Sequence, residues 1–283
     1  MNSRRTFLKT GLIGVSGVAV AGLPFQATRA GQGVAKPQED RFHLGVAGYS
    51  FVHFNLDESL AMMKRMGIEY LCIKDFHLPL NSSEAEIAAF HQKLAAHGVT
   101  GYAVGPIYMT KSRDEIDNAF AYAKRVGVDT LVGIPNKEDL AYIAGKTAEY
   151  NIKYAIHNHG PEDKLYPNAT VIYDLVRNLD KRVGMCFDMG HNMRDGEDPI
   201  RDLKRYTDRI FDIHLKNVTS ATAEGKTCEL GRGVIDIPAF VRMLRKVGYT
   251  GKCSLEYEKD MKDPLAGLAE STGYFRGVLD GTR

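Results

Sequence analysis

The chain has 283 residues, of which 44% are hydrophobic and 25% are charged, and its formal net charge is +2 at pH 7. This composition is that of a globular protein able to bury a large core, and it argues against intrinsic disorder. The small net charge and the lack of an evident basic cluster argue against the strongly cationic nucleic-acid-binding proteins, so we expect no nucleic-acid partner.

The first thirty residues have the order of an export signal. Two arginines, Arg4 and Arg5, precede an apolar run rich in Gly and Ala over 11–25, and small residues follow up to Ala30. The paired arginines followed by Phe-Leu-Lys resemble the twin-arginine class of signals, whose machinery exports folded proteins. The apolar run is shorter than the roughly 20 residues that a spanning helix needs, so we expect cleavage after Ala30 and no stable membrane anchor.

Cleavage after Ala30 would leave a mildly acidic mature protein. Residues 1–30 hold four basic residues and no acid, so their loss changes the formal net charge from +2 to −2. Residues 31–41 are polar, contain Gly and Pro and lack hydrophobic periodicity, which predicts a linker. We therefore expect a signal peptide over 1–30, a linker over 31–41, one folded domain over 42–283 and a periplasmic location.

Short apolar runs alternate with amphipathic stretches from residue 43 onward, which is the pattern of repeated βα units and a parallel sheet. The predicted strands span 43–47, 70–74, 100–104, 130–134, 153–157, 183–188, 211–217 and 252–257. The predicted helices span 56–66, 83–97, 111–126, 137–149, 170–179, 199–206 and 237–247, with a last one from 264 onward. Gly67, Gly98, Gly127 and Gly248 each follow a predicted helix, where a left-handed residue would end it.

Eight such units over residues 42–283 predict a single-domain (β/α)8 TIM barrel. The alternative is an open doubly wound sheet, but the first strand is followed by Gly48-Tyr49-Ser50-Phe51 and not by a Gly-rich phosphate-binding turn. The cysteines lack the short, regular spacing of a disulfide framework, so we expect buried thiols and no required disulfide. They are Cys72, Cys186, Cys228 and Cys253.

Polar residues close the last four predicted strands. His157, Asp188, His214 and Glu256 stand at the ends of strands five to eight, and barrel closure would bring them to one rim. Any one of them alone would more often be a hydrogen-bonded core residue, but two buried carboxylates together need a compensating cation. We expect these four to bind a divalent metal, and a mixed N/O set suits Mn, Zn, Fe or Co better than Ca or Mg.

Several motifs around these positions resemble those of the xylose-isomerase-like barrel superfamily of sugar isomerases and epimerases. The motifs are Phe-Asp-Met-Gly-His at 187–191, His-Leu-Lys-Asn at 214–217, Gly-Arg-Gly-Val-Ile-Asp at 231–236, Gly-Tyr-Thr-Gly at 248–251 and Leu-Glu-Tyr-Glu at 255–258. The resemblance covers essentially the whole mature chain. It implies metal ligation by Asp188, His214 and Glu256, with His191 and Arg232 near the substrate.

The end of strand five departs from the pattern of that family. Where the family commonly has Glu-Asn-His, this chain has His157-Asn158-His159, so the fourth ligand would be His157. In ketose epimerases two glutamates on opposite sides of the substrate exchange a proton, and only Glu256 would remain here. We therefore expect Glu256 to be the main proton-transfer group.

Further site residues are expected from their positions after strands. Besides Glu256, the catalytic candidates are Lys74, His191 and Lys216, and the substrate-binding candidates are His159, His191, Arg232 and Glu162. Lys74 ends an apolar strand, where it could stabilise an oxyanion or form an ion pair with a rim carboxylate. Glu162 could equally belong to a solvated loop.

The predicted function is that of a metal-dependent isomerase or epimerase that converts a sugar or sugar derivative through an enediolate. The first alternative is a lyase or hydratase acting on 3-keto-glycosides, since one base and one metal suffice to expel a group from such a ketone. An endonuclease of the same superfamily and a non-catalytic sugar-binding barrel are weaker alternatives. The partner would be a small carbohydrate, and the sequence leaves a homo-oligomer open.

We expect the mature protein to begin near Gly31 and to be recovered from the periplasm of its native host, because the arginine pair, apolar run and small residues occur in the required order. Amino-terminal sequencing of the periplasmic fraction measures this directly. Intact, unprocessed protein in the cytoplasm of the unmodified host would contradict the prediction.

Overall fold

The computed structural model describes residues 39–283. The expected export signal and nearly all of the expected linker lie outside these residues, so the signal, the cleavage site and the periplasmic location stay predictions. Within the described residues, no helix is long and apolar enough to cross a membrane.

Eight parallel strands form a closed barrel, which confirms the predicted fold. The strands are β1 (His43–Ala47), β2 (Tyr70–Ile73), β3 (Thr100–Met109), β4 (Thr130–Pro135), β5 (Lys153–His157), β6 (Val183–Asp188), β7 (Ile210–Leu215) and β10 (Lys252–Leu255). The barrel closes where β1 pairs with β10, the last strand in the sequence. A short antiparallel pair, β8 (Asn217–Val218) and β9 (Thr227–Cys228), stands apart from the barrel sheet.

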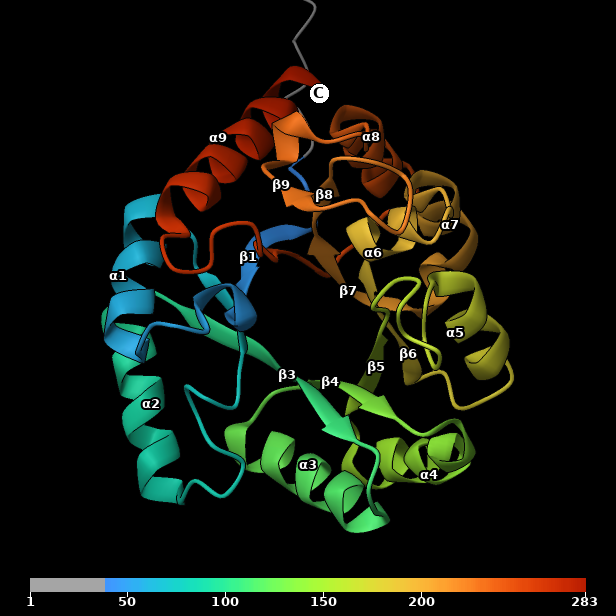
Figure 1. Cartoon of the computed structure of the whole chain (residues 1–283). Helices are drawn as coiled ribbons and strands as arrows, with labels where there is room; N and C mark the ends of the chain where they lie inside the picture. Colours follow the sequence, from blue (N-terminus) through green and yellow to red (C-terminus); the bar gives the residue numbers. More distant parts are fainter. Residues whose placement is uncertain (1–38) are drawn as a thin grey trace, which may run out of the picture. The chain divides into compact units, whose positions relative to one another are not determined.

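Helices surround the strands on the outside of the barrel (Figure 1). They are α1 (Leu56–Met66), α2 (Glu84–Ala96), α3 (Arg113–Val126), α4 (Leu140–Tyr150), α5 (Ala169–Val176), α6 (Met189–Arg194), α7 (Pro199–Tyr206), α8 (Ile237–Lys246) and α9 (Leu265–Gly281). Short 3-10 turns are η1 (Gly48–Phe51), η2 (Lys137–Asp139), η3 (Thr207–Arg209) and η4 (Leu230–Arg232).

Local sequence signals explain where the helices begin and end. The Asn55 side chain accepts a hydrogen bond from Glu58 N at 3.0 Å at the start of α1, and the Glu58 carboxylate accepts from Asn55 N in return. Gly67 and Gly127 end α1 and α3 with φ of 63° and 79°, a left-handed conformation that residues with a side chain rarely adopt. These glycines stop each helix as expected and turn the chain towards the next strand.

The seventh and last barrel strands end at Leu215 and Leu255, two residues before the predicted ends at 217 and 257, and two larger differences concern the third strand and a short helix. The third strand is longer than the expected 100–104, because its pairing with β4 resumes after an irregularity and joins Ile107 to Gly133 and Met109 to Pro135. The short helix α6 was not predicted. It forms directly after β6 because the Asp188 side chain accepts from His191 N at 2.7 Å and caps the first turn.

Most of the hydrophobic core lies in one continuous cluster of buried side chains, while a smaller cluster joins neighbouring barrel strands. The smaller cluster consists of Cys72, Ala103, Val132, Ala155 and Cys186. All four cysteines are free thiols in buried positions, as expected for small packing residues.

Candidate metal centre

Two columns of polar side chains stand on neighbouring strands of the barrel. The β7 column consists of Asp212, His214 and Lys216, and the β10 column consists of Ser254, Glu256 and Glu258. Lys216 follows directly after β7, while Glu256 and Glu258 lie one and three residues beyond Leu255, the last residue of β10. Because residues two apart share one face of a strand, the spacing within each column puts its side chains on one side. β7 and β10 pair in parallel, with Ser254 opposite His214.

The columns are joined by hydrogen bonds at successive levels. At the lowest level, Tyr102 Oη from β3 donates to Asp212 Oδ2 at 2.9 Å and lies 2.6 Å from Ser254 Oγ. One level higher, His214 Nδ1 lies 3.2 Å from Glu256 Oε2. These contacts hold the side chains of the two columns against each other, first at the level of Asp212 and Ser254 and then at the level of His214 and Glu256.

The expected metal ligands converge at the middle level. His157 Nε2, at the end of β5, lies 2.9 Å from His214 Nδ1 and 3.6 Å from Glu256 Oε2. Asp188 Oδ2, at the end of β6, lies 3.9 Å from His157 Nε2. One ligand atom from each of the four residues lies within 4.8 Å of all the others. We call this set the quartet.

The quartet fits a divalent ion. His157 Nε2 and His214 Nδ1 face each other, and only one nitrogen of such a pair can donate a proton to the other. Asp188 Oδ2 is buried and accepts no hydrogen bond of normal geometry. A metal ion among these atoms would take the lone pairs of both imidazoles and both carboxylates, with ligand distances of about 2.0–2.2 Å.

The protonation behaviour of the quartet follows from its burial. Burial raises the pKa of Asp188 to about 6 and lowers the pKa of His157 well below its ordinary value, so this imidazole is neutral. Burial also opposes ionisation of Glu256, but Lys216 and His214 outweigh it and hold the pKa of Glu256 well below its usual range. A bound divalent ion would favour the ionised form of Asp188, so metal binding below about pH 6 would release its proton.

The amide of Asn158 and the carboxylate of Asp212 contact quartet residues on the side away from the expected metal. Asn158 exchanges two hydrogen bonds of 2.9 Å with the backbone of Asp188, which holds the ends of β5 and β6 together. Asp212 Oδ2 lies 3.8 Å from His214 Nε2, the ring nitrogen that points away from the quartet. A carboxylate in this place orients a metal-bound imidazole and determines which nitrogen carries its proton.

Lys216 lies immediately above the quartet and is 1% exposed. Its Nζ lies 3.1 Å from Asp188 Oδ2, 2.9 Å from Glu256 Oε2 and 2.7 Å from Glu258 Oε2. His191 Nε2 is a fourth neighbour at 3.0 Å. Burial opposes the charge of Lys216, but the three carboxylates outweigh it and raise its pKa well above the ordinary value. Burial and the nearby ammonium lower the pKa of His191 well below its ordinary value, so His191 is neutral.

A cavity of about 180 Å³ opens onto the quartet. Its lining residues are Tyr49, Lys74, Pro106, Tyr108, His157, His159, His191, Glu256 and Glu258. Lys74 Nζ donates to Pro106 O at 2.7 Å and forms an ion pair of 2.9 Å with Asp75. The cavity is smaller than the roughly 300–1,000 Å³ of sites for drug-sized ligands, and a small polar molecule suits it better.

Two of the expected substrate-binding residues lie outside this cavity. The Arg232 side chain is 63% exposed and binds Glu270 of α9 through two hydrogen bonds of 2.6 Å. The Glu162 side chain is 61% exposed and pairs with Arg194, at the end of α6. His159 does line the cavity, with Nε2 at 3.4 Å from the hydroxyl of Tyr108. Arg232 and Glu162 do not line the cavity, and their roles in substrate binding stay predictions.

Three residues of the site, Glu258, Asp212 and Tyr102, were not among the candidates predicted from the sequence. For the first two, a signal was present in the spacing: Asp212 lies two residues before His214 on β7, and Glu258 lies two residues after Glu256, just beyond β10. Tyr102 gave no such signal, because its contact with Asp212 joins strands that are far apart in sequence.

A larger hollow of about 810 Å³ opens at the opposite end of the barrel, where the strands begin. Its lining includes Thr130, Lys153 and Lys252, which are the first residues of β4, β5 and β10. Active sites of TIM barrels lie at the carboxyl ends of the strands, so we assign the site to the smaller cavity.

We expect Asp212→Asn to weaken zinc binding about 10- to 100-fold, the usual effect of removing a carboxylate behind a metal-bound histidine. Isothermal titration calorimetry of the metal-free protein measures the affinity. Asp202→Asn is a matched control, because Asp202 is also fully buried but accepts hydrogen bonds from Asn192 and Arg201. Equal zinc affinity of Asp212→Asn and the unchanged protein would contradict a role for Asp212 in the metal centre.

Two curated relatives match parts of the chain. The rhizopine catabolism protein MocC of Rhizobium meliloti is 29% identical over 136 residues, which are 43% of this chain and 41% of that protein. An inosose dehydratase of Lacticaseibacillus casei is 32% identical over 94 residues, which are 28% of this chain and 32% of that protein. The chain thus spans less than half the length of these two relatives.

A solved structure matches nearly the whole barrel. The crystal structure of the IOLI protein with a bound zinc atom superimposes with a TM-score of 0.69 at 19% identity, covering 86% of this chain and 99% of that one. At this identity the likeness concerns the fold. Residues 60–278 match the family described as xylose isomerase-like TIM barrel. The chain therefore belongs to the xylose isomerase-like TIM barrel family.

Proposed function

We propose that the protein is a metal-dependent lyase that acts on a keto-sugar or keto-polyol. The observation that carries this proposal is the placement of the carboxylates. Both carboxylates that line the cavity, Glu256 and Glu258, come from the segment directly after β10, whereas the end of β5 and the residues after it contribute the imidazoles of His157 and His159. Basic carboxylates on a single wall suit removal of a proton from one side of a substrate, without its return from the opposite side.

The quartet would hold the metal that this reaction needs. A divalent ion held there would polarise a carbonyl oxygen of the substrate and stabilise the negative charge that develops on it when a neighbouring C–H bond breaks. The two imidazoles and two carboxylates favour Mn, Zn, Fe or Co. The zinc in the structurally similar IOLI protein supports a metal of this class.

Glu256 is the residue that we assign to proton removal. Its contacts with His157, His214 and Lys216 all use Oε2, so Oε1 remains for a substrate C–H bond. The positive charge of Lys216 keeps the Glu256 carboxylate ionised, which is the form that accepts a proton. Glu256 also lines the cavity, as direct contact with a substrate requires.

Lys74 is the residue that we assign to the leaving group. In the elimination, a C–H bond next to the ketone breaks, a C=C bond forms, and the C–O bond on the following carbon breaks. The leaving oxygen then needs a proton, which the ammonium group of Lys74 can supply from the cavity wall. With a hydroxyl as leaving group the product is water, and with a glycosidic oxygen the product is an alcohol.

The relatives support elimination more than isomerisation. The Lacticaseibacillus casei protein is named a dehydratase, an enzyme that removes water, and the match to it is 32% identical. That match covers 32% of the relative's length, so dehydratase activity of this chain is a proposal.

An isomerase or epimerase is the second candidate, and one observation favours it. His159 lines the same cavity from β5 and carries an imidazole that could return a proton to the substrate from its own side. Glu256 and His159 would then act as the acid/base pair.

Product analysis separates the two reactions. The metal-loaded protein is incubated in D2O with an inosose, a free ketose and a 3-keto-glycoside, and the products are followed by NMR. A lyase forms a C=C bond conjugated to the ketone and releases water or an alcohol. Epimerisation or isomerisation would retain every oxygen and place solvent deuterium on carbon, and that result would overturn the proposal.

We expect Glu256→Gln to lower kcat by about 100-fold or more, because the amide keeps the size of the side chain but cannot accept the proton. Metal content is measured on the same sample, so that a lost proton acceptor is distinguished from a lost metal. Glu149→Gln serves as the control, since Glu149 pairs with Lys146 and is 57% exposed. Full activity of a metal-loaded Glu256→Gln variant would exclude Glu256 as the base.

A further inference from the structure

The ammonium group of Lys216 has the surroundings of a metal ion. Three carboxylate oxygens, from Asp188, Glu256 and Glu258, and one imidazole nitrogen, from His191, lie 2.7–3.1 Å from Nζ. A lysine on a protein surface commonly pairs with one carboxylate in water, whereas this one is enclosed by four acceptors and is 1% exposed.

The same acceptors would form a second metal site without the lysine. One ligand atom each from His191, Glu256 and Glu258 lies within 4.8 Å of the others, which is the spacing that a divalent ion can join. Glu256 also belongs to the quartet, so it would be shared between two ions. Shared carboxylates are typical of two-metal centres, whose ions lie about 3.5–4 Å apart.

Neighbouring residues leave Lys216 little room to move from this position. A Cβ atom at Gly190 of α6 would come within 2.6 Å of Lys216 Cγ, so the missing side chain at Gly190 makes space for the lysine stem. The next residue, Asn217, is held by hydrogen bonds from its amide to Leu230 O at 2.7 Å and Ile235 O at 3.1 Å.

The charges around Lys216 balance with a single divalent ion. The three carboxylates carry three negative charges, which one ammonium and one divalent ion neutralise together. A second divalent ion beside the ammonium would leave uncompensated positive charge in a buried site, which is costly.

We propose that Lys216 occupies the second metal position of a centre that could otherwise hold two ions, and that it thereby limits the protein to one divalent ion per chain. The ammonium group of the lysine then stands beside the quartet in place of a second metal ion. This inference concerns the number of metal ions, and it holds for a lyase and an isomerase alike.

Zinc counting tests the inference. Metal-free protein is dialysed against buffered zinc, and bound zinc is measured by mass spectrometry of the metal and by protein concentration. We expect one zinc per chain in the unchanged protein and two in Lys216→Ala. The double variant Lys216→Ala with Glu258→Gln should return to one, because it lacks a ligand of the second position.

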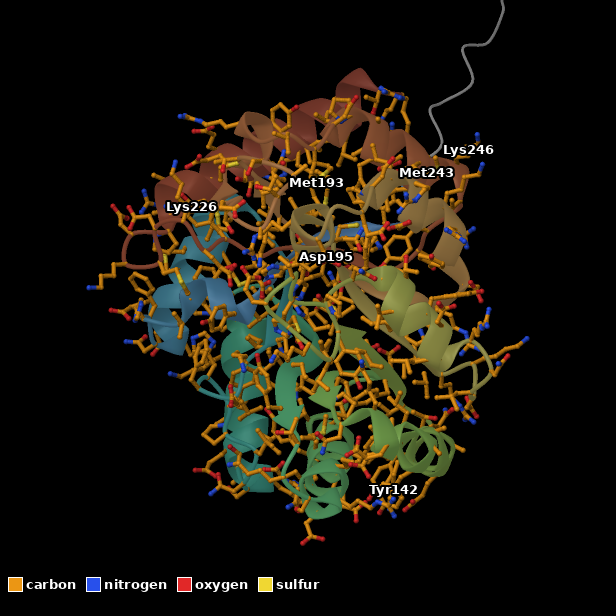
Figure 2. All side chains as sticks on the ribbon, turned by 45° about the vertical axis from the view of Figure 1, so that its right-hand side comes forward. Tyr142, Met193, Asp195, Lys226, Met243 and Lys246 are labelled. Atoms are coloured by element: carbon orange, nitrogen blue, oxygen red, sulfur yellow. The ribbon has the colours of Figure 1, made fainter. Side chains whose placement is uncertain are left out.

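Lys146→Ala is the matched control and should bind one zinc. Lys146 Nζ also lies between two carboxylates, at 3.0 Å from Asp117 and from Glu149, but its polar contacts within residues 39–283 include no imidazole. Its helix, α4, carries Tyr142, which Figure 2 shows at the lower edge of the view, away from Met193 of α6.

Three outcomes would overturn the inference: two zinc ions in the unchanged protein, one in a Lys216→Ala variant with native circular dichroism, or two in the double variant. Lys216→Ser replaces Lys216→Ala if the latter does not fold, since serine can hydrogen-bond to the carboxylates left behind. If neither variant folds, the count in the unchanged protein decides alone, with one ion in support and two against.

Discussion

Buried charge is the constraint on which the candidate site depends. Asp188, Asp212 and His214 are fully buried, and Glu256 and Lys216 are 4% and 1% exposed. An isolated charge in such surroundings would cost several kcal/mol, so each of these groups has to lie against a partner of opposite charge or a hydrogen-bond donor. The parallel pairing of β7 with β10 provides the partners, because it sets two columns of alternating side chains next to each other.

The same pairing connects catalysis to stability. The carboxylate that we assign to proton removal is held by a lysine that also satisfies two other carboxylates, so the proton acceptor and the charge balance belong to one network. Hydrogen-bonded networks of this kind respond to the loss of one member as a whole, because each remaining buried group then lacks a partner. A bound metal would extend this network to His157 and His214, because Asp188 and Glu256 belong to the quartet and also contact Lys216.

The sequence was sufficient to predict the barrel and the closeness of the four quartet side chains, whose role as metal ligands stays a prediction. Strands and helices alternate regularly, and parallel strands end at one rim, so residues that close strands five to eight had to lie close together. The sequence was insufficient where the direction of a side chain depends on the conformation of a loop. Arg232 and Glu162 lie after strands, but their directions depend on Glu270 in α9 and Arg194 in α6, which no local pattern reveals. The contact between Lys216 and Glu258 depends on the register of β7 against β10, which forms only when the barrel closes.

The barrel divides its tasks between its two halves. All four quartet residues come from β5 to β10, whereas the first half of the chain lines the cavity with Tyr49, Lys74, Pro106 and Tyr108. Substitutions at these four positions, which lie after β1, after β2 and within β3, can therefore change the shape of the cavity without removing a metal ligand. An ancestral protein built in this way could acquire new substrates through one half while the other half preserved the same chemistry.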